Sequence, residues 1–170
     1  MLPYWARMDD STTAEDPWGI LGQEEDGWFF CLRMLGERYA FEAALALEVI
    51  RLGPLTRLPA APSFLPGVFH HRGEVLAALD LGQLIADHAT SLAHGSRTVI
   101  VQTGAWKLAL LAEGIEGLIR IPEESFEPPP SLGSPAAALL TRVGRDPKGH
   151  VSILDLERLI ESARLRGVRA

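Results

Sequence analysis

The histidines and the single cysteine are the residues of this chain best suited to ligate a metal ion or to act as nucleophiles. His70 and His71 are adjacent on a predicted strand, so their side chains point to opposite faces and cannot easily share one metal ion. No histidines or cysteines have the H-x-x-x-H or C-x-x-C spacing of a metal site. Cys31 lies in an apolar run, where burial disfavours the reactive thiolate. We therefore expect no metal, no cofactor and no enzymatic activity.

Three pairs of adjacent acidic residues could in principle support acid–base chemistry, at positions 9–10, 24–25 and 123–124. All three lie in the N-terminal segment or in a predicted loop, where such pairs more often mark a solvated surface. The sequence also lacks the glycine-rich phosphate loop, the dinucleotide-binding fingerprint and the nucleophile elbow. The ionisable residues therefore build no recognisable active site.

Length and composition indicate one soluble domain of 170 residues, or two very small ones. The 16 Lys and Arg against 22 Asp and Glu give a net charge of −6, which argues against a nucleic-acid partner. Uninterrupted apolar runs are far shorter than the roughly 20 residues of a membrane span, so we expect no direct membrane contact. A lone cysteine and the absence of a signal-peptide pattern favour the cytoplasm.

Glycine and proline turns divide the chain into an N-terminal tail and a series of short elements. Residues 1–26 are acidic and poor in periodicity, which predicts a flexible tail, although Trp5 or Trp18 could anchor it to the body or to a partner. Residues 27–168 form the folded domain. The predicted strands are 28–34, 39–41, 67–71, 74–79, 98–103, 106–112, 115–121, 139–143 and 150–154, the helices are 81–87 and 156–165, and residues 42–50 are helical or mixed.

An internal repeat is the most informative pattern in the sequence. The segment 72–85 contains a basic–Gly turn, an apolar strand, Asp80 and a short amphipathic helix, and the segment 148–160 repeats this order with Asp155. Glycine suits the positive φ of a tight turn, and each Asp is well placed to cap the helix that follows. The repeat predicts two small β-barrels side by side, one over about residues 28–88 and one over about 95–165, with a groove between them.

The region from residue 49 to 81 resembles the signature of CheW-like domains, the adaptors of bacterial chemosensory arrays. The resemblance rests on Leu55-Thr56-Arg57-Leu58-Pro59, Gly67-Val68, Arg72-Gly73 and Leu79-Asp80-Leu81, and it extends over about residues 28–165. It implies a mainly β fold of two small SH3-like five-stranded β-barrels side by side, with short helices and a C-terminal helix.

The resemblance also implies an adaptor without catalysis, with two partners. One is the cytoplasmic tip of a methyl-accepting chemoreceptor, held in the groove between the barrels. The other is the regulatory domain of the histidine kinase CheA, which pairs barrel to barrel. The residues that we expect at partner-binding surfaces are Arg72, Gly73, Glu48, Val68 and Arg142. Arg72 matches a surface arginine of the family and Glu48 an acidic position that can pair with it, although Arg72 could simply be a hairpin-turn residue.

The chain departs from the family pattern at three places. His70-His71 replaces the usual Asn-Leu, Arg142 replaces a usual glycine, and Glu113-Gly114 stands in place of a Val-Asp-x-Val element. The last two changes leave open a divergent paralogue that binds a receptor without recruiting CheA. An alternative of another class is a small β-barrel enzyme or ligand-binding domain, which would need convergent polar groups in a pocket.

Overall fold

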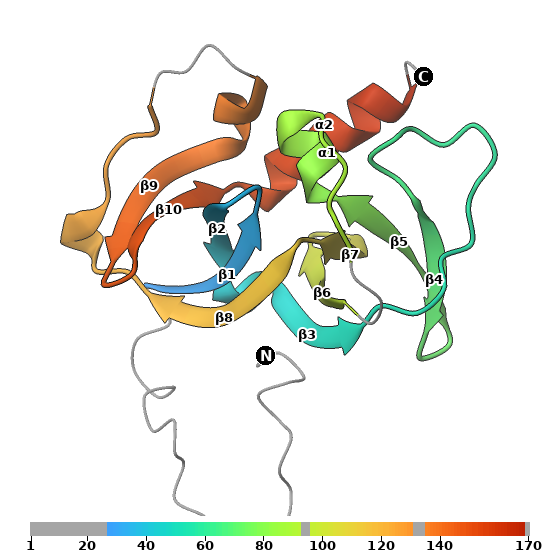
Figure 1. Ribbon diagram of the computed structural model, residues 1–170, viewed down its shortest axis with the longest axis horizontal. Coiled ribbons are helices and arrows are strands. Elements are labelled where there is room, and N and C mark those ends of the chain that lie inside the picture. The colour runs from blue at the N-terminus through green and yellow to red at the C-terminus, as the bar shows by residue number, and fades with distance from the viewer. Residues whose placement is uncertain (1–26, 93–95, 131–134, 169–170) are drawn as a thin grey trace, which may run out of the picture.

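The structure is a computed structural model that describes residues 27–92, 96–130 and 135–168 (Figure 1). The expected tail, residues 1–26, lies outside the described residues. The fold is mainly β, as predicted, and the described strands form two five-stranded sheets that curl into barrels side by side. The strands are β1 (Trp28–Met34), β2 (Glu37–Glu42), β3 (Ala46–Arg51), β4 (Gly67–His71), β5 (Glu74–Asp80), β6 (Arg97–Thr103), β7 (Trp106–Leu111), β8 (Gly114–Arg120), β9 (Leu140–Asp146) and β10 (Gly149–Leu154). The helices are α1 (Leu81–Ala86) and α2 (Leu156–Val168), with 3-10 turns η2 (Ala43–Leu45), η3 (Glu123–Ser125) and η4 (Pro135–Leu139).

The two sheets have the same internal order of strands. One runs β8-β1-β2-β10-β9 and the other β3-β6-β7-β5-β4. Each contains one parallel pair, β2 with β10 and β5 with β7, and its other pairs are antiparallel. Strands β1–β5 therefore correspond one to one to β6–β10, and α1 corresponds to α2. We call β8-β1-β2-β10-β9 the split barrel and β3-β6-β7-β5-β4 the continuous barrel.

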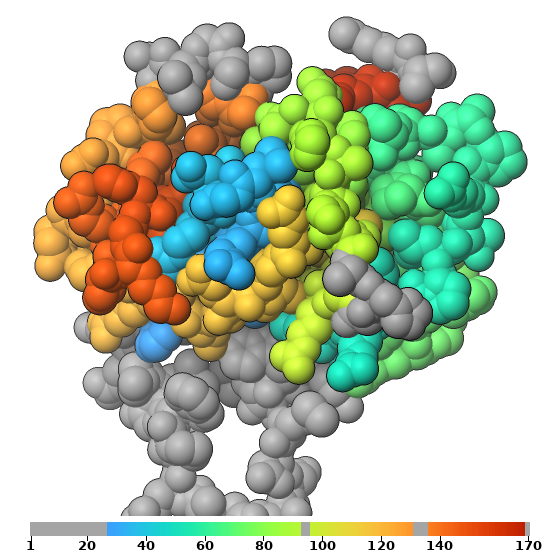
Figure 2. Space-filling model, in the orientation of Figure 1, coloured from blue at the N-terminus to red at the C-terminus, as the bar shows by residue number. Residues whose placement is uncertain are grey.

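The predicted division into barrels over residues 28–88 and 95–165 is wrong. The continuous barrel occupies residues 46–111, whereas the split barrel combines residues 28–42 with residues 114–154. The hairpin β1–β2 pairs with the second half of the chain, and the corresponding hairpin β6–β7 pairs with the first half. Figure 2 shows this exchange directly, because the blue N-terminal hairpin is flanked by yellow, orange and red C-terminal segments.

The segment 42–50, expected to be helical or mixed, is a short 3-10 turn followed by strand β3. Its alanine, leucine and glutamate residues favour a helix in isolation. Strand β3 forms nonetheless because Val49 and Ile50 pair with Val99 and Thr98 of β6, which lies about 50 residues further along the chain. Long-range pairing therefore overrides local preference here.

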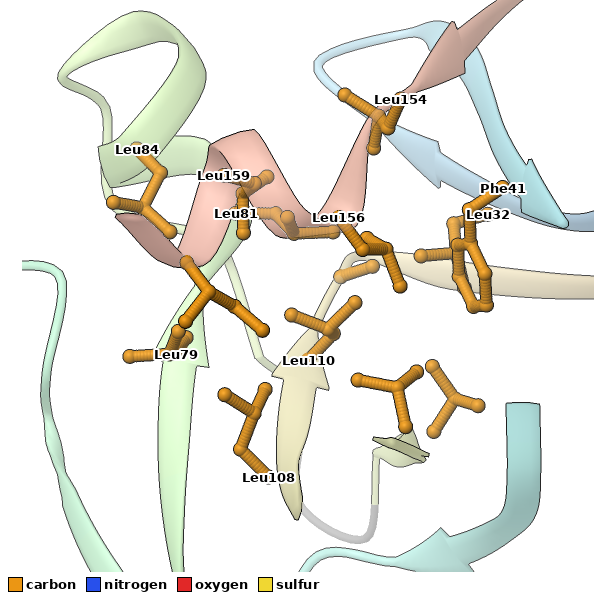
Figure 3. Close-up of a cluster of buried hydrophobic side chains, with 14 of the residues drawn as sticks. Leu32, Phe41, Leu79, Leu81, Leu84, Leu108, Leu110, Leu154, Leu156 and Leu159 are labelled. Carbon is orange, nitrogen blue, oxygen red and sulfur yellow. The ribbon is translucent and has the colours of Figure 1, made fainter. Parts of the chain in front are cut away.

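The largest cluster of buried side chains lies between the two barrels and the helices. It joins residues from the split barrel, such as Leu32 and Phe41, to residues from the continuous barrel, such as Leu108 and Leu110. Helix α2 contributes its buried face to this cluster (Figure 3). That face consists of Leu156, Leu159, Ile160 and Ala163. Each barrel also has a smaller interior cluster of its own. The barrels thus share one core and keep a fixed relative position.

Both predicted helix caps are confirmed. The Asp80 carboxylate accepts a hydrogen bond from the Gln83 amide, and the Asp155 carboxylate accepts one from the Arg158 amide, in each case three residues into the helix. Asp80 is also buried and accepts hydrogen bonds from the amide and hydroxyl of Thr90. It therefore anchors the loop after α1 as well as the helix itself.

Candidate partner-binding surface

The turn at Arg72-Gly73 joins β4 to β5 at one end of the continuous barrel. His71 and Glu74 are the last paired residues of the hairpin, so Arg72 and Gly73 form a two-residue turn. Both have positive φ, 49° and 83°, as a type I′ turn requires. The left-handed conformation is unfavourable for a residue with a side chain, so Arg72 is held in a strained position. Such strain tends to gather at functional sites.

Glu48 is the acidic partner of this turn. Its Oε2 atom lies 3.1 Å from Nη2 of Arg72, and its Oε1 atom contacts Nε2 of His71. The Glu48 side chain is only 13% exposed, whereas that of Arg72 is 50% exposed. The pairing of Glu48 with Arg72 that the family resemblance implied is therefore present in the structure. The ion pair with Glu48 orients the Arg72 guanidinium, which remains exposed at the surface.

This cluster also joins the two edges of one sheet. Strands β3 and β4 are the outermost strands of the continuous barrel, and Glu48 lies on β3 whereas His71 lies on β4. His71 was considered in the sequence as a possible metal ligand and as a departure from the family pattern, but its contact with Glu48 was not predicted. No local signal could have revealed that contact, because 23 residues separate the two positions.

Val68 lies on β4 and is partly buried. Its backbone exchanges two hydrogen bonds with Thr56, with N···O distances of 2.8 and 2.9 Å. A Cβ atom at the neighbouring Gly67 would lie only 2.5 Å from the Thr56 carbonyl oxygen, so this close approach requires glycine. The Gly67-Val68 motif therefore holds the loop that follows β3 against strand β4.

One exposed apolar residue beside the turn was not predicted from the sequence. Val75, on β5, has 58% of its surface exposed and lies directly opposite His70 on β4. Alternation along the strands places Val75 on the same face as Val68, whereas Leu76 and Phe69 point into the barrel. The alternation of residues 74–78 was the available signal, because it assigns Val75 to the outer face. Val68 and Val75 therefore lie on the outer face of the continuous barrel, whereas Glu48, opposite Ile100, lies on the inner face and reaches Arg72 at the β4–β5 turn.

Arg142 is not part of this group. It lies on β9 in the split barrel, and Figure 1 shows β9 and β4 on opposite sides of the molecule. Its guanidinium is 3.7 Å from the centre of the Phe126 ring, and its Nη1 atom is 2.9 Å from Oε1 of Glu123. The charge that replaces the usual glycine is therefore paired within the chain and stacked on an aromatic ring.

Glu113, in the second departure, also has a structural partner. Its Oε2 atom accepts a hydrogen bond of 3.0 Å from the Leu35 amide in the β1–β2 turn. Leu35 has a φ of 53°, so this bond stabilises a turn residue in an unfavourable conformation. Glu113 thereby links the connection between β7 and β8 to the exchanged N-terminal hairpin.

A partly buried ionic cluster closes the split barrel. Arg38, on β2, binds Asp146 of β9 with two hydrogen bonds of 2.7 Å and also binds Glu116 of β8. Strands β8 and β9 are the outer strands of this sheet, so Arg38 joins its two edges. The hydrogen bonds from Arg38 lower the pKa of Asp146, and those to Asp146 raise the pKa of Arg38. Because Arg38, Asp146 and Glu116 pair with one another, we interpret the cluster as stabilising the barrel.

The enzyme alternative finds no support in the described residues. A hollow of about 490 Å³ lies between α1, η4 and α2, but its charged residues Asp87 and Arg166 pair with each other at 2.9 Å. No three His, Cys, Asp or Glu side chains of the described segments lie close enough to hold a metal ion. Burial raises the pKa of Cys31 to about 11, so its thiol is protonated at neutral pH.

Neither described α-helix is long and apolar enough to cross a membrane.

Comparison with known proteins gives a consistent family. A family model described as the CheW-like domain matches residues 29–164. The chain is 36% identical to the protein FrzA of Myxococcus xanthus over 142 aligned residues. The aligned region covers 82% of this chain and 89% of that protein. It is 24% identical over 144 residues to the chemotaxis protein CheW of Klebsiella aerogenes, with 84% and 87% coverage. The scaffolding protein TtCheW from Thermoanaerobacter tengcongensis has the same fold, with a TM-score of 0.72 and 24% identity over 79% of this chain and 92% of that chain.

The family match includes the elements on which the candidate surface is built. It spans both barrels and most of α2, and therefore the exchanged hairpins as well as the Arg72-Gly73 turn. The level of identity to FrzA over most of both chains is independent support for the same assignment. The chain is therefore a member of the CheW-like domain family, a family of non-catalytic scaffold proteins of chemotaxis.

Proposed function

We propose that this protein is a non-catalytic cytoplasmic adaptor that couples methyl-accepting chemoreceptors to the histidine kinase CheA. The observation that carries the proposal is the CheW-like match over residues 29–164, within which Glu48 and Arg72 form the expected ion pair. Glu48, Val68, Arg72, Gly73 and Val75 are proposed to form part of the partner-binding surface. An exposed guanidinium next to an exposed valine suits an interface that combines an apolar contact with a directed charge.

A binding experiment tests this proposal. The purified protein is titrated by calorimetry with a receptor cytoplasmic fragment and, separately, with a CheA regulatory domain. Arg72→Glu should weaken at least one interaction about tenfold or more, because it reverses a charge at the proposed surface. Arg164→Glu is the matched control, since Arg164 is similarly exposed and also forms an ion pair, but on α2. Failure of the unaltered protein to bind either partner would refute the proposal.

A second candidate is a divergent paralogue that binds a receptor but does not recruit CheA. The observation that favours it is Arg142, which covers the Phe126 ring on the split barrel where the family resemblance implies a glycine. If this guanidinium obstructs the kinase contact, Arg142→Gly should raise the affinity for the CheA regulatory domain. If the unaltered protein binds the CheA regulatory domain with low-micromolar affinity, and Arg142→Gly does not change that affinity, the divergent paralogue is refuted and the coupling adaptor remains. The internal pairing of Arg142 with Glu123 favours the coupling adaptor.

A further inference from the structure

The net negative charge of this protein comes from its N-terminal segment. Residues 1–26 contain seven acidic residues and one basic residue, Arg7, which gives −6. Subtracting these from the totals of 22 and 16 leaves 15 acidic and 15 basic residues in residues 27–170, which is a net charge of zero. A neutral body therefore carries a strongly acidic segment. The seven acidic residues are Asp9, Asp10, Glu15, Asp16, Glu24, Glu25 and Asp26.

Two arginines on the continuous barrel are placed directly opposite each other. Arg51 is the last residue of β3, Arg97 is the first residue of β6, and the two are paired in the antiparallel register. Both are exposed, and no ion pair joins either of them to another residue of the described segments. Like charges in directly opposite positions repel each other and destabilise the strand pair. An anionic group between the two guanidinium groups would remove this repulsion.

The other exposed arginines near the C-terminus offer no comparable site. Arg158 pairs with Asp155, Arg164 with Glu161 and Arg166 with Asp87, each at 3.2 Å or less. An acidic segment that approached α2 would therefore compete with carboxylates already in place. Charge complementarity thus favours the Arg51–Arg97 pair over α2.

Arg51 and Arg97 also lie on the face of the sheet that packs toward the other barrel. Side chains alternate along a strand, so Arg97 projects on the same face as Val99 and Val101. Those two valines belong to the core cluster shared by both barrels, whereas Ile100 points into the continuous barrel. Arg51 and Arg97 therefore lie at the solvent end of the face along which the barrels meet.

We infer that the acidic segment of residues 1–26 docks on Arg51 and Arg97 of its own chain through its carboxylates. Reach does not limit this contact, because 26 extended residues span about 85 Å and a domain of this size is about 40 Å across. The segment joins the body at Gly27, whose carbonyl accepts a hydrogen bond from the Ile121 amide at the end of β8. The docked segment would cover one end of the face between the barrels.

Paramagnetic relaxation in the full-length protein tests this inference. A spin label is attached to a cysteine introduced by Ser11→Cys, next to Asp9 and Asp10. The native Cys31 is fully buried with its pKa raised to about 11, so it does not compete for the label. At about 10 mM salt the amide signals of residues 50–52 and 96–98 should lose about half or more of their intensity, and about 0.5 M salt should restore them because it screens charges beyond a few ångströms.

A matched pair of variants assigns the contact to these arginines. The double change Arg51→Gln with Arg97→Gln should abolish the broadening, whereas Arg158→Gln with Arg164→Gln removes the same charge from α2 and should leave it unchanged. Broadening that is centred elsewhere, that is absent at low salt or that persists without Arg51 and Arg97 would overturn the inference. So would broadening that arises only between a spin-labelled molecule and a second, isotope-labelled copy, since that would assign the contact to a partner copy.

Discussion

Glu48 and Arg72 come from opposite edges of the same five-stranded sheet, and an ion pair of 3.1 Å joins them where the sheet closes. Glu48 is mostly buried, and Arg72 belongs to a strained turn at the surface. The buried carboxylate thus holds the exposed guanidinium in one direction. The pair can therefore be separated experimentally into its contribution to stability and its contribution to binding.

Exchanging the two charges tests this separation. Arg72→Glu alone places two carboxylates together, and it should lower the free energy of unfolding by about 1 kcal/mol because the pair is partly exposed. Adding Glu48→Arg restores an opposite-charge pair but removes the contact of Glu48 with His71, so it should recover only part of that loss, and it should not recover partner binding. Urea unfolding and calorimetric titration measure the two effects. Recovery of binding together with stability would show that the surface does not read the sign of the charge at position 72.

The two helix caps should differ in their contribution to stability. Asp155→Ala removes one capping hydrogen bond at a partly exposed position and should cost about 1 kcal/mol. Asp80→Ala also leaves the buried amide and hydroxyl of Thr90 without their acceptor and should cost about 3 kcal/mol. Thermal or urea unfolding of both variants gives the comparison. Equal costs would contradict the anchoring role of Asp80.

The loop that follows β3 should depend on glycine at one position only. Gly67→Ala would place a methyl group 2.5 Å from the Thr56 carbonyl oxygen, so it should destabilise the protein by about 1–3 kcal/mol. Gly53→Ala is a control in the same loop, because no atom lies within 4 Å of the added Cβ and its φ is not positive. It should be neutral or slightly stabilising, since it restricts the unfolded chain. A neutral Gly67→Ala would show that the loop moves freely away from β4.

Asp146 should make stability depend on pH in the acidic range. Its pKa is lowered in the folded protein by hydrogen bonds from Arg38, below the unfolded value of about 3.9. The stability that it contributes is therefore complete above the unfolded pKa and is lost as the pH falls through the folded pKa. Asp146→Asn should cost about 2 kcal/mol at pH 7, because it weakens charged hydrogen bonds in a partly buried cluster where Arg38 keeps Glu116 as a partner.

The control for this prediction is how the loss of unfolding free energy caused by Asp146→Asn depends on pH. The gap in unfolding free energy between the unaltered protein and Asp146→Asn should narrow below about pH 4, as Asp146 becomes protonated. Asp87→Asn is a suitable reference, because Asp87 is 82% exposed and its pair with Arg166 is at the surface. A gap that stays constant from pH 7 to pH 3 would contradict the assignment to Asp146.

Local signals in the sequence predicted the elements well because each depends on a few neighbouring residues. The turn at Arg72-Gly73, the caps at Asp80 and Asp155 and the buried face of α2 follow from φ preferences, capping chemistry and helical spacing. The same signals located the repeat. They could not say which strands pair across the repeat, and so the predicted barrel boundaries were wrong.

The candidate site was only partly accessible from sequence for the same reason. Glu48 and Arg72 were available through the family resemblance, whereas the contact of His71 with Glu48 requires the closed sheet. The compensation of Arg142 by Glu123 and Phe126 also depends on how the loop after β8 folds over β9. A departure from a family pattern therefore cannot be judged as a defect until its spatial neighbours are known.

In the sequence, the continuous barrel lies between the two segments that form the split barrel, and this arrangement sets an order for biosynthesis. During translation, residues 46–111 can complete the continuous barrel while the strands that must accompany β1 and β2 are still unmade. The apolar residues of the first hairpin, including Phe30 and Phe41, must then wait for β8 and β10 to leave the ribosome. Chains stalled after residue 111 should therefore present this hairpin to chaperones, and the exposure should end only once β8 and β10 have been made.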